Sequence, residues 1–397
     1  MNPSLRPRSL LCLLLPAALG CPTPSSRAPV VASQEREDTV CMAVYDAGST
    51  GTRLHLYVSE GEAGWTQQGR LRAGAVADPI REIRGKSWAD AEAVAVEIAG
   101  LLPQLQTDYD WSRRCRLASV TLLATAGMRL AEQAQPERAA TMYAAVEAAI
   151  GRELEAAGVE APVEARTLTG FEEGLYAWLA LPGGPSPNLG LVEMGGASAQ
   201  VVFPCPGCEE ALPVRVGDAS MSIVSHSFLG LGENEAPAAI CAGVDGPPPA
   251  CAYGVGLDDP SWSPAACVAT MNFSGGSDDG GIVDPYNYGA QGQGSTVSLP
   301  VERFTGEWRL TGGLAYAKAG DVDDCCRNRG EGCYDPPQSC FSAVYRSAFL
   351  EAIGVPNDAR AADSSWTLGF VMCRSSDCLG ALEGPLPCRW RADGCAR

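Results

Sequence analysis

Two short segments of the chain repeat one pattern, and this repetition constrains the fold more than any other feature. Residues 44–57 read VYDAGSTGTRLHLY, and residues 191–203 read LVEMGGASAQVVF. Each segment has an apolar strand, an acidic residue, a turn of small residues and a second strand of alternating character. Aligning Asp46 with Glu193 superimposes the two turns. The repetition predicts two related lobes, each built around a β-hairpin.

The turn of each hairpin is suited to contact a phosphate chain. Glycines such as Gly48 and Gly195 allow backbone N–H groups to approach an anion closely. The acidic residues before the turns, Asp46 and Glu193, can hold a divalent cation through its water molecules. The pair of hairpins therefore indicates a phosphate chain and its metal ion held between two lobes.

Composition limits the classes of function. With 397 residues, of which 46% are hydrophobic, the chain can form one or two globular domains with substantial cores. A net charge of −18 argues against nucleic acid as a partner, because binding a polyanion normally requires a basic face. The two histidines, His55 and His226, form no closely spaced pair, which disfavours a histidine-ligated zinc site or a histidine-based triad.

The N-terminal residues have the form of a secretory signal peptide. Arg6 and Arg8 precede an apolar run, and small residues follow up to residue 20. Cys21 could be lipidated, and residues 21–38 form a Pro/Ser-rich linker. No later apolar run reaches the roughly 20 residues that span a bilayer. We expect a secreted or extracytoplasmic monomer, periplasmic or tethered at the cell surface if Cys21 carries a lipid.

Seventeen cysteines agree with an oxidising compartment. After a signal peptide, disulfides are favoured over zinc or redox roles, although the pairing cannot be read from the sequence. When Cys12 and Cys21 are set aside, the remaining number is odd. At least one thiol is therefore expected to be free or to form an intermolecular bond.

The order of elements along the chain predicts α/β layers. Residues 117–124 form an apolar, β-rich run, and Pro136 begins a helix that extends to about residue 150. A second helix begins near residue 170 and places Glu173 on the face opposite its apolar residues. Residues 341–353 are predicted to be helical and residues 365–372 to form an apolar strand. Strands that alternate with helices are typical of an α/β fold.

We divide the chain into a signal peptide, a linker and two lobes. The first lobe comprises residues 39–166, and residues 370–397 return to it. The second lobe comprises residues 167–369 and contains a Gly/Pro-rich loop insertion at residues 243–300.

Four motifs in order resemble those of the ecto-nucleoside triphosphate diphosphohydrolases, or apyrases. They lie at residues 46–53 (DAGSTGTR), 124–129 (ATAGMR), 169–178 (TGFEEGLYAW) and 193–200 (EMGGASAQ). The resemblance covers roughly residues 40–375. It implies two RNase H-like lobes with a cleft between them, as in actin, hexokinase and the Hsp70 ATPase. It also implies metal-dependent hydrolysis of terminal phosphates from nucleoside tri- and diphosphates, with Ca²⁺ or Mg²⁺ as the cofactor.

The resemblance also implies a role for individual residues. Glu173 would be the base that activates water, and Ser198 and Gln200 would hold that water. Tyr316 would stack on the nucleobase. The positions implied to contact phosphate are Gly48, Ser49, Thr50, Gly51, Arg53, Thr125, Arg129, Gly195, Gly196 and Ala197. The positions implied to serve the metal ion are Asp46 and Glu193, through waters, and Trp366, beside its water shell.

Other interpretations of these residues remain open. Glu173 could be an exposed helix residue, the glycine turns could serve only to close two hairpins, and Trp366 could belong to the core. Glu193 stands where the family usually has an aspartate, which affects metal preference and rate. Alternative functions are those of an exopolyphosphatase or guanosine pentaphosphatase, or of a catalytically weak nucleotide-binding surface protein.

Overall fold

The computed structural model of the chain describes residues 39–49, 51–59, 61, 64–73, 90–241, 246–278, 280–286, 295–318 and 320–380. The signal peptide, the linker with Cys21, Thr50 and residues 381–397 lie outside the described residues.

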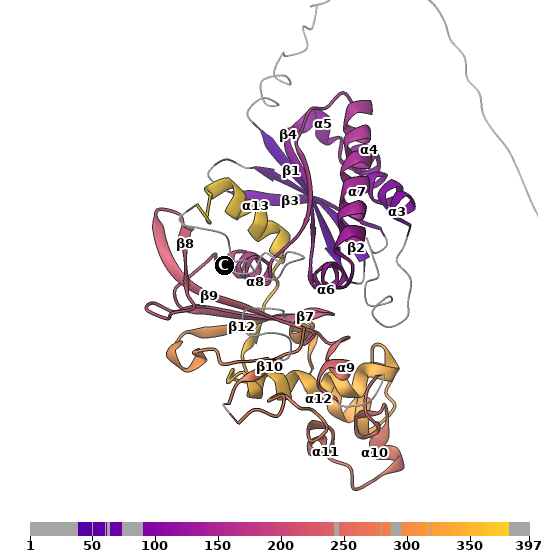
Figure 1. Cartoon of the computed structure of the whole chain (residues 1–397), viewed down its shortest axis with the longest axis vertical. Coiled ribbons are helices and arrows are strands. Elements are labelled where there is room, and N and C mark those ends of the chain that lie inside the picture. Colours follow the sequence, from indigo (N-terminus) through magenta and orange to yellow (C-terminus); the bar gives the residue numbers. More distant parts are fainter. Residues whose placement is uncertain are drawn as a thin grey trace, which may run out of the picture.

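The first sheet has five strands in a mixed arrangement (Figure 1). In spatial order they are β3 (Trp65–Ala73), β2 (Gly51–Ser59), β1 (Val40–Gly48), β4 (Arg116–Ala124) and β5 (Val163–Thr167). The central strand β1 pairs antiparallel with β2 and parallel with β4. The predicted strand at residues 117–124 is thus confirmed as β4, which is buried because it lies inside the sheet.

The second sheet repeats this topology with one additional edge strand. Its order is β13 (Arg360–Ala361), β12 (Glu307–Gly312), β6 (Leu189–Met194), β7 (Ser198–Pro204), β9 (Ala219–Leu229) and β8 (Leu212–Val216). Here β6 pairs antiparallel with β7 and parallel with β12, as β1 does with β2 and β4. The predicted duplication of the hairpin is therefore confirmed, and it extends to the whole sheet.

Helices pack in layers around the two sheets. The outer face of the first sheet packs against α3 (Ala91–Ala99), α4 (Leu101–Tyr109), α5 (Trp111–Arg114) and α7 (Pro136–Ala156). The helix α6 (Ala126–Ala134) follows β4 directly. Figure 1 shows α8 (Gly170–Leu179) and α13 (Trp366–Ser376) in the layer between the sheets. The predicted helices beginning at Pro136 and near residue 170 are both present.

The outer face of the second sheet is covered by α12 and by short elements (Figure 1). The helices are α9 (Ala236–Ile240), α10 (Val255–Asp258), α11 (Pro264–Val268) and α12 (Pro336–Ala352), with short helical turns η2 (Pro249–Cys251), η3 (Val301–Arg303), η4 (Gly313–Tyr316) and η5 (Asp323–Arg327). Two short strands, β10 (Ile282–Asp284) and β11 (Ser295–Val297), pair with each other. The predicted helix at residues 341–353 corresponds to most of α12.

Six disulfides are present among the described residues, and only one of them, Cys41–Cys115, spans a long stretch of sequence (74 positions), while the other five span 16 positions or fewer. The pairs are Cys41–Cys115, Cys205–Cys208, Cys251–Cys267, Cys325–Cys333, Cys326–Cys340 and Cys373–Cys378. Three of these pairs lie among the short elements, where small helices alone would contribute little stability. Within the described part of the chain, Cys241 is a free and buried thiol. The described residues include no helix long and apolar enough to cross a bilayer.

One expectation about secondary structure was wrong. Residues 365–372 form part of the helix α13 and not a strand. Every residue of this segment is buried or half-buried, so its sequence shows no clear amphipathic period. The alternative interpretation of Glu173 as an exposed helix residue is also excluded, because α8 is buried and Glu173 is only 7% exposed.

Candidate functional site

The tips of the two duplicated hairpins line one pocket of about 500 Å³. The first tip contributes Ser49 and the second contributes Gly196. A Cβ atom built on Gly196 would lie 3.0 Å from Ser49 Oγ, so the two tips approach each other closely. The pocket therefore lies where the sequence pattern predicts a phosphate chain to bind.

Most of the predicted site residues line this pocket. They are Asp46, Gly48, Ser49, Arg53, Thr125, Glu173, Glu193, Gly195, Gly196, Ala197, Ser198, Tyr316 and Trp366. Gln200 and Arg129 lie behind the lining, where they contact Glu173, and Gly51 is a buried strand residue. The structure thus brings together residues from both lobes and from all four motifs. Three motifs contribute residues of a hairpin or turn, and the fourth, in α8, contributes Glu173.

The second tip is held from behind by the segment that follows β9. The N–H groups of Gly230, Glu233 and Asn234 donate to the carbonyl oxygens of Ala197, Gly195 and Gly196 at 2.8, 3.0 and 2.9 Å, respectively. These bonds support a turn that has no neighbouring strand of its own at this point.

Close packing also restricts the residue behind the second tip. A Cβ atom on Gly232 would lie 2.4 Å from the backbone nitrogen atoms of both Ala197 and Ser198. Only glycine lets the backbone pass this close. The position of the second tip therefore depends on Gly232, which lies about 35 positions after the tip in the sequence.

Two consecutive glutamates at the start of α8 have different roles. The hydroxyl of Thr169 accepts a hydrogen bond from the N–H of Glu172 at 3.1 Å, and the Glu172 carboxylate accepts one from the N–H of Thr169 at 2.9 Å. This capping box, together with an ion pair of 2.9 Å to Arg166, occupies Glu172. Glu173 is left to face the pocket.

The carboxylate of Glu173 accepts two hydrogen bonds from the side chains behind it. Arg129 Nη2 and Gln200 Nε2 both donate to Glu173 Oε2, the latter at 3.0 Å. Gln200 Nε2 also lies 2.6 Å from Ser198 Oγ, and Arg129 Nη2 lies 3.2 Å from the same oxygen. Glu173 is thus held by an amide and a guanidinium next to a hydroxyl, as a group that must orient a reacting water would be.

Three carboxyl groups that are buried or half-buried share the pocket, and their pKa values are raised. Burial, with the negative charges of Glu173 and Asp46, raises the pKa of Glu193 to about 8. Burial raises the pKa of Asp46 to about 6, although the nearby Arg53 opposes this. Burial also raises the pKa of Glu173, against the lowering effect of Arg129. Burial thus favours the protonated form of all three carboxyl groups.

The residues present fit a hydrated divalent cation. Glu193 Oε2 is buried without a hydrogen-bond partner, which is costly unless a cation or water meets it. The described residues contain no group of three or more His, Cys, Asp or Glu side chains that could ligate a metal ion directly. Asp46 and Glu193 are thus suited to hold Ca²⁺ or Mg²⁺ through its waters, as expected for cations that keep part of their hydration shell.

The side chains of His55, Gln67 and Arg70 also line the pocket, although the sequence did not predict them as site residues. His55 Nδ1 lies 3.0 Å from Gln67 Oε1, and burial lowers the pKa of His55 to about 4, so the ring is neutral at pH 7. Arg70 adds a second guanidinium beside Arg53. The alternation of Arg53 and His55 along β2 was a signal that both side chains share one face of the strand.

The remaining lining comes from the start of α13 and from the turn η4. Asp363, Ser364, Ser365 and Thr367 also line the pocket and were not predicted. Trp366 belongs to the core between the sheets and also lines the pocket, so both interpretations of it agree with its position. Tyr316 is 76% exposed, which leaves its ring free to contact a ligand at the pocket rim.

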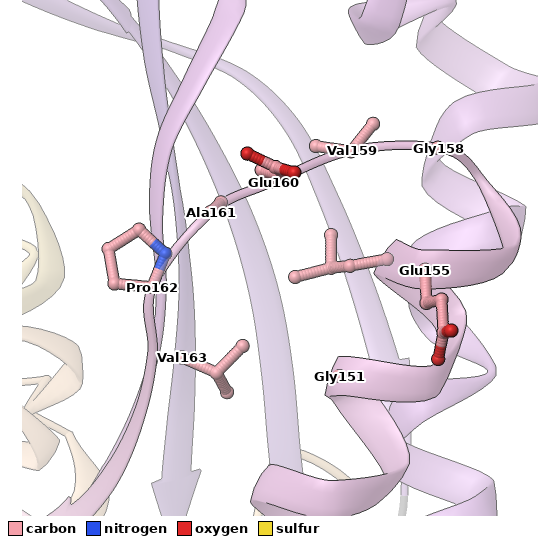
Figure 2. A pocket seen from close by; sticks show the side chains of 9 residues that line it. Gly151, Glu155, Gly158, Val159, Glu160, Ala161, Pro162 and Val163 are labelled. Atoms are coloured by element: carbon pink, nitrogen blue, oxygen red, sulfur yellow. The ribbon is translucent and has the colours of Figure 1, made fainter.

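A second pocket lies at the other end of the first lobe, between the end of α7 and the chain that enters β5 (Figure 2). Its lining is made of small and apolar residues with Glu155 and Glu160. It has no cationic side chain to bind phosphate and no pair of hairpin tips. The pocket between the hairpins is therefore the candidate active site.

Comparison with known proteins supports this choice. The profile of the GDA1/CD39 (nucleoside phosphatase) family matches residues 32–242, which is more than half of the chain and includes both hairpins. The chain belongs to this family. The predicted resemblance to apyrases is thereby confirmed at the level of the nucleoside phosphatase family.

Curated relatives of this family member include plant proteins named as probable apyrases and animal ectonucleoside triphosphate diphosphohydrolases. "Probable apyrase 6" from Arabidopsis thaliana is 31% identical over 218 residues, which is 49% of this chain and 35% of that protein. Ectonucleoside triphosphate diphosphohydrolase 6 from Homo sapiens is 28% identical over 229 residues, which is 52% of this chain and 43% of that protein. The chain thus spans less than half the length of these relatives.

A solved structure shares the fold of this family member. The crystal structure of nucleoside triphosphate hydrolases from Neospora caninum matches 86% of this chain and 94% of its own, with a TM-score of 0.54 and 16% identity. At this identity the likeness concerns the fold. Together with the duplicated sheets, it confirms the predicted α/β class with two lobes of the actin, hexokinase and Hsp70 type.

Proposed function

We propose that this chain is a metal-dependent apyrase that removes terminal phosphates from nucleoside tri- and diphosphates. One observation carries the proposal. Two hairpin tips of the same register meet across a pocket into which a buried carboxylate, Glu173, projects from a third element. Hydrolysis of a phosphoanhydride requires a positioned water, a group that accepts its proton and donors for the phosphate oxygens. This pocket offers side chains that can position a water, a carboxylate to accept its proton and donors for phosphate oxygens.

In this proposal Glu173 accepts the proton of the attacking water. Ser198 and Gln200 orient that water. Gln200 Nε2 lies 3.0 Å from Glu173 Oε2 and 2.6 Å from Ser198 Oγ, so the three side chains lie together. Arg129 donates to Glu173 and so favours its ionised form, which a base requires. Burial opposes this effect and keeps the carboxylate basic enough to take a proton.

The hairpin tips hold the phosphate chain. The backbone N–H groups around Gly48 and Gly195 contact the phosphate oxygens, and Arg53 and Thr125 add side-chain donors. Thr125 precedes α6, whose positive end therefore faces the pocket. Asp46 and Glu193 hold Ca²⁺ or Mg²⁺ through its waters, with Trp366 beside that shell. The cation, when bound, neutralises charge on the phosphate oxygens.

Arg129 is placed differently from the other residues proposed to contact phosphate. Its guanidinium is bonded to Glu173, Ser198 and Ser227 behind the pocket lining. A direct contact of Arg129 with phosphate remains a prediction, as does that of Gly51 and of Thr50. Tyr316 is proposed to stack on the nucleobase at the rim, where its ring is exposed.

The setting of the protein is a further part of the proposal. Six disulfides among the described residues favour an oxidising compartment, and we propose a secreted or cell-surface monomer. We also propose the lobe bounds given above. The helix α13 contacts strands β1, β2 and β3 of the first sheet as well as α8, which supports a return of the C-terminal residues to the first lobe.

A phosphate-release panel tests the function. Purified protein is incubated with ATP, ADP, UTP, GDP, pyrophosphate and long-chain polyphosphate, each with Ca²⁺, Mg²⁺ or EDTA. The proposal expects release from the nucleotides in the presence of either cation and none in EDTA.

The same panel distinguishes the alternatives. Release from polyphosphate in preference to ATP would favour an exopolyphosphatase. Nucleotide binding without any release would instead indicate a nucleotide-binding surface protein. Either result would contradict the proposed apyrase activity.

A further inference from the structure

Ser227 is a buried serine that contacts the candidate catalytic cluster without lining the pocket. It lies on β9 directly opposite Gln200 of β7 and is 4% exposed. The sequence motifs described above do not include it. Its position behind the reacting groups raises the question of what its hydroxyl does.

The Ser227 hydroxyl accepts hydrogen bonds from two side chains that also bind Glu173. Arg129 Nη1 donates to Ser227 Oγ at 3.0 Å, while the other terminal nitrogen, Nη2, donates to Glu173. Gln200 Nε2 lies 3.1 Å from Ser227 Oγ and 3.0 Å from Glu173 Oε2. Ser227 and Glu173 are thus bridged twice, by a guanidinium and by an amide.

This double bridge restricts how the two donors can turn. A primary amide carries two hydrogens, yet Gln200 Nε2 lies near three acceptor oxygens, those of Glu173, Ser198 and Ser227. An acceptor at Ser227 draws one hydrogen of the amide toward β9 and so fixes the rotation of its plane. The same oxygen fixes one edge of the Arg129 guanidinium, which leaves the other edge on Glu173.

The start of α8 is built to allow this contact. A Cβ atom on Gly170 would lie 2.4 Å from Ser227 Cβ and 2.6 Å from Arg129 Nη1. Any side chain at this position would therefore push Ser227 and Arg129 away from the helix that carries Glu173. The first residue of α8 is a glycine at the point where three elements meet.

The geometry points to Ser227 as a positioning residue that holds Arg129 and Gln200 on the Glu173 carboxylate. This inference rests on the proposed function, because it assumes that Glu173 acts on the water. Ser227 does not touch the substrate. Its loss should therefore slow the chemical step and leave nucleotide binding intact.

The chain contains a matched control two residues away. Ser225 lies on the same strand, and its hydroxyl donates to the carbonyl of Phe171 in α8 at 3.0 Å. The Ser225 hydroxyl thus anchors α8 directly, whereas the Ser227 hydroxyl accepts hydrogen bonds from Arg129 of α6 and Gln200 of β7. Of these hydrogen bonds, those to Arg129 and Gln200 are made by Ser227 and not by Ser225.

The test compares Ser227→Ala with Ser225→Ala in the full chain. For each variant, kcat and KM for ATP are measured with Ca²⁺, and the Kd of a non-hydrolysable ATP analogue gives the fraction of folded, binding-competent protein. We expect kcat of Ser227→Ala to fall about tenfold or more, as is typical when a hydrogen bond to a charged group is lost, with KM and Kd unchanged. Ser225→Ala should keep kcat close to that of the unmodified protein.

Two outcomes would overturn the inference. One is an unchanged kcat for Ser227→Ala, and the other is an equal fall in kcat for Ser225→Ala, which would indicate a general loosening of α8. If Ser227→Ala does not fold, Ser227→Cys provides the same comparison with a side chain of similar shape and a weaker acceptor. Failure of the proposed function would be recognised separately, because Glu173→Gln would then remain active.

Discussion

Asp46 and Glu193 occupy equivalent positions in hairpins of the same register, but the residue paired with Asp46 is cationic and the residue paired with Glu193 is uncharged. Asp46 is paired across its hairpin with Arg53, and their side chains form an ion pair of 3.2 Å. Glu193 is paired with Gln200, whose amide is already bonded to Glu173. The carboxyl group of the second hairpin therefore lacks the cation that balances the first. This asymmetry agrees with the state of Glu193 Oε2, which is buried without a hydrogen-bond partner among the described residues.

The two adjacent glutamates of α8 should have separable effects. Glu173→Gln is expected to lower the kcat of the folded protein about 10²- to 10⁴-fold, because it removes the proton acceptor. Glu172→Gln is expected to lower the free energy of unfolding by about 1–3 kcal/mol, because it weakens the capping box and the ion pair with Arg166. Turnover per folded molecule should be nearly unchanged for Glu172→Gln. Steady-state kinetics and chemical denaturation measure the two effects, and the reverse pattern would contradict the roles assigned here.

The raised pKa of Glu193 predicts how stability depends on pH. The folded-state pKa of about 8 lies above the ordinary value of 4.5. Between these values the folded protein binds more protons than the unfolded chain, so its free energy of unfolding falls as pH rises. We expect this fall, up to about 1.4 kcal/mol per pH unit for one group, in denaturant titrations from pH 5 to 8 in EDTA.

Two changes should flatten this pH dependence of stability. Glu193→Gln removes the titrating group, and Ca²⁺ or Mg²⁺ neutralises it. Asp46 adds a similar dependence below its own pKa of about 6. A stability profile of Glu193→Gln in EDTA that matches the unmodified protein above pH 6 would show that Glu193 does not carry the effect.

Tyr316 should affect binding of the nucleobase but not of the phosphate chain. Tyr316→Ala is expected to raise KM for ATP roughly tenfold, since stacking of one base on an aromatic ring contributes about 1–3 kcal/mol. The KM for inorganic tripolyphosphate, which has no base, should not change. Tyr334→Ala is the control, because Tyr334 is 95% exposed and does not line the pocket. An equal change in KM for both substrates would rule out stacking.

Gly232 should not tolerate a side chain, whereas Gly151 in α7 should tolerate one. Gly232→Ala places a Cβ atom 2.4 Å from the backbone of the second hairpin tip and is expected to cost about 1–3 kcal/mol of stability, with a fall in kcat. Gly151 lies in α7 with open space around it, so Gly151→Ala should stabilise the protein by up to about 1 kcal/mol. Thermal and denaturant unfolding measure both changes. A neutral Gly232→Ala would mean that the tip can shift freely.

Several features of the site could be predicted because they are encoded locally. An apolar strand, an acidic residue and a turn of small residues lie within about ten positions of one another, so one motif specifies a complete hairpin. The repetition of the motif then predicted two related sheets, and the structure has them. The capping residues of α8 are also local, since Thr169 and Glu172 are three positions apart.

Other features depended on packing between distant segments. The burial of Glu173 arises because α8 lies between two sheets, and no neighbouring residue signals this. The strand predicted at residues 365–372 was wrong because this part of α13 is buried or half-buried at every position, so no exposed polar face reveals the helical period. His55, Gln67 and Arg70 were missed because the facing of a strand toward a pocket depends on which other elements pack against it.

The amino-acid sequence by itself determined the two hairpins, their glycine tips and the acidic residue before each one, because bond geometry and turn chemistry act over a few residues. Only the tertiary structure decided which side chains surround Glu173. Arg129 and Ser227 are 98 positions apart and meet only when α6 of the first lobe packs against β9 of the second. Electrostatic environment is a property of space and not of sequence distance, so the charge balance of the pocket emerges only when both lobes are in place.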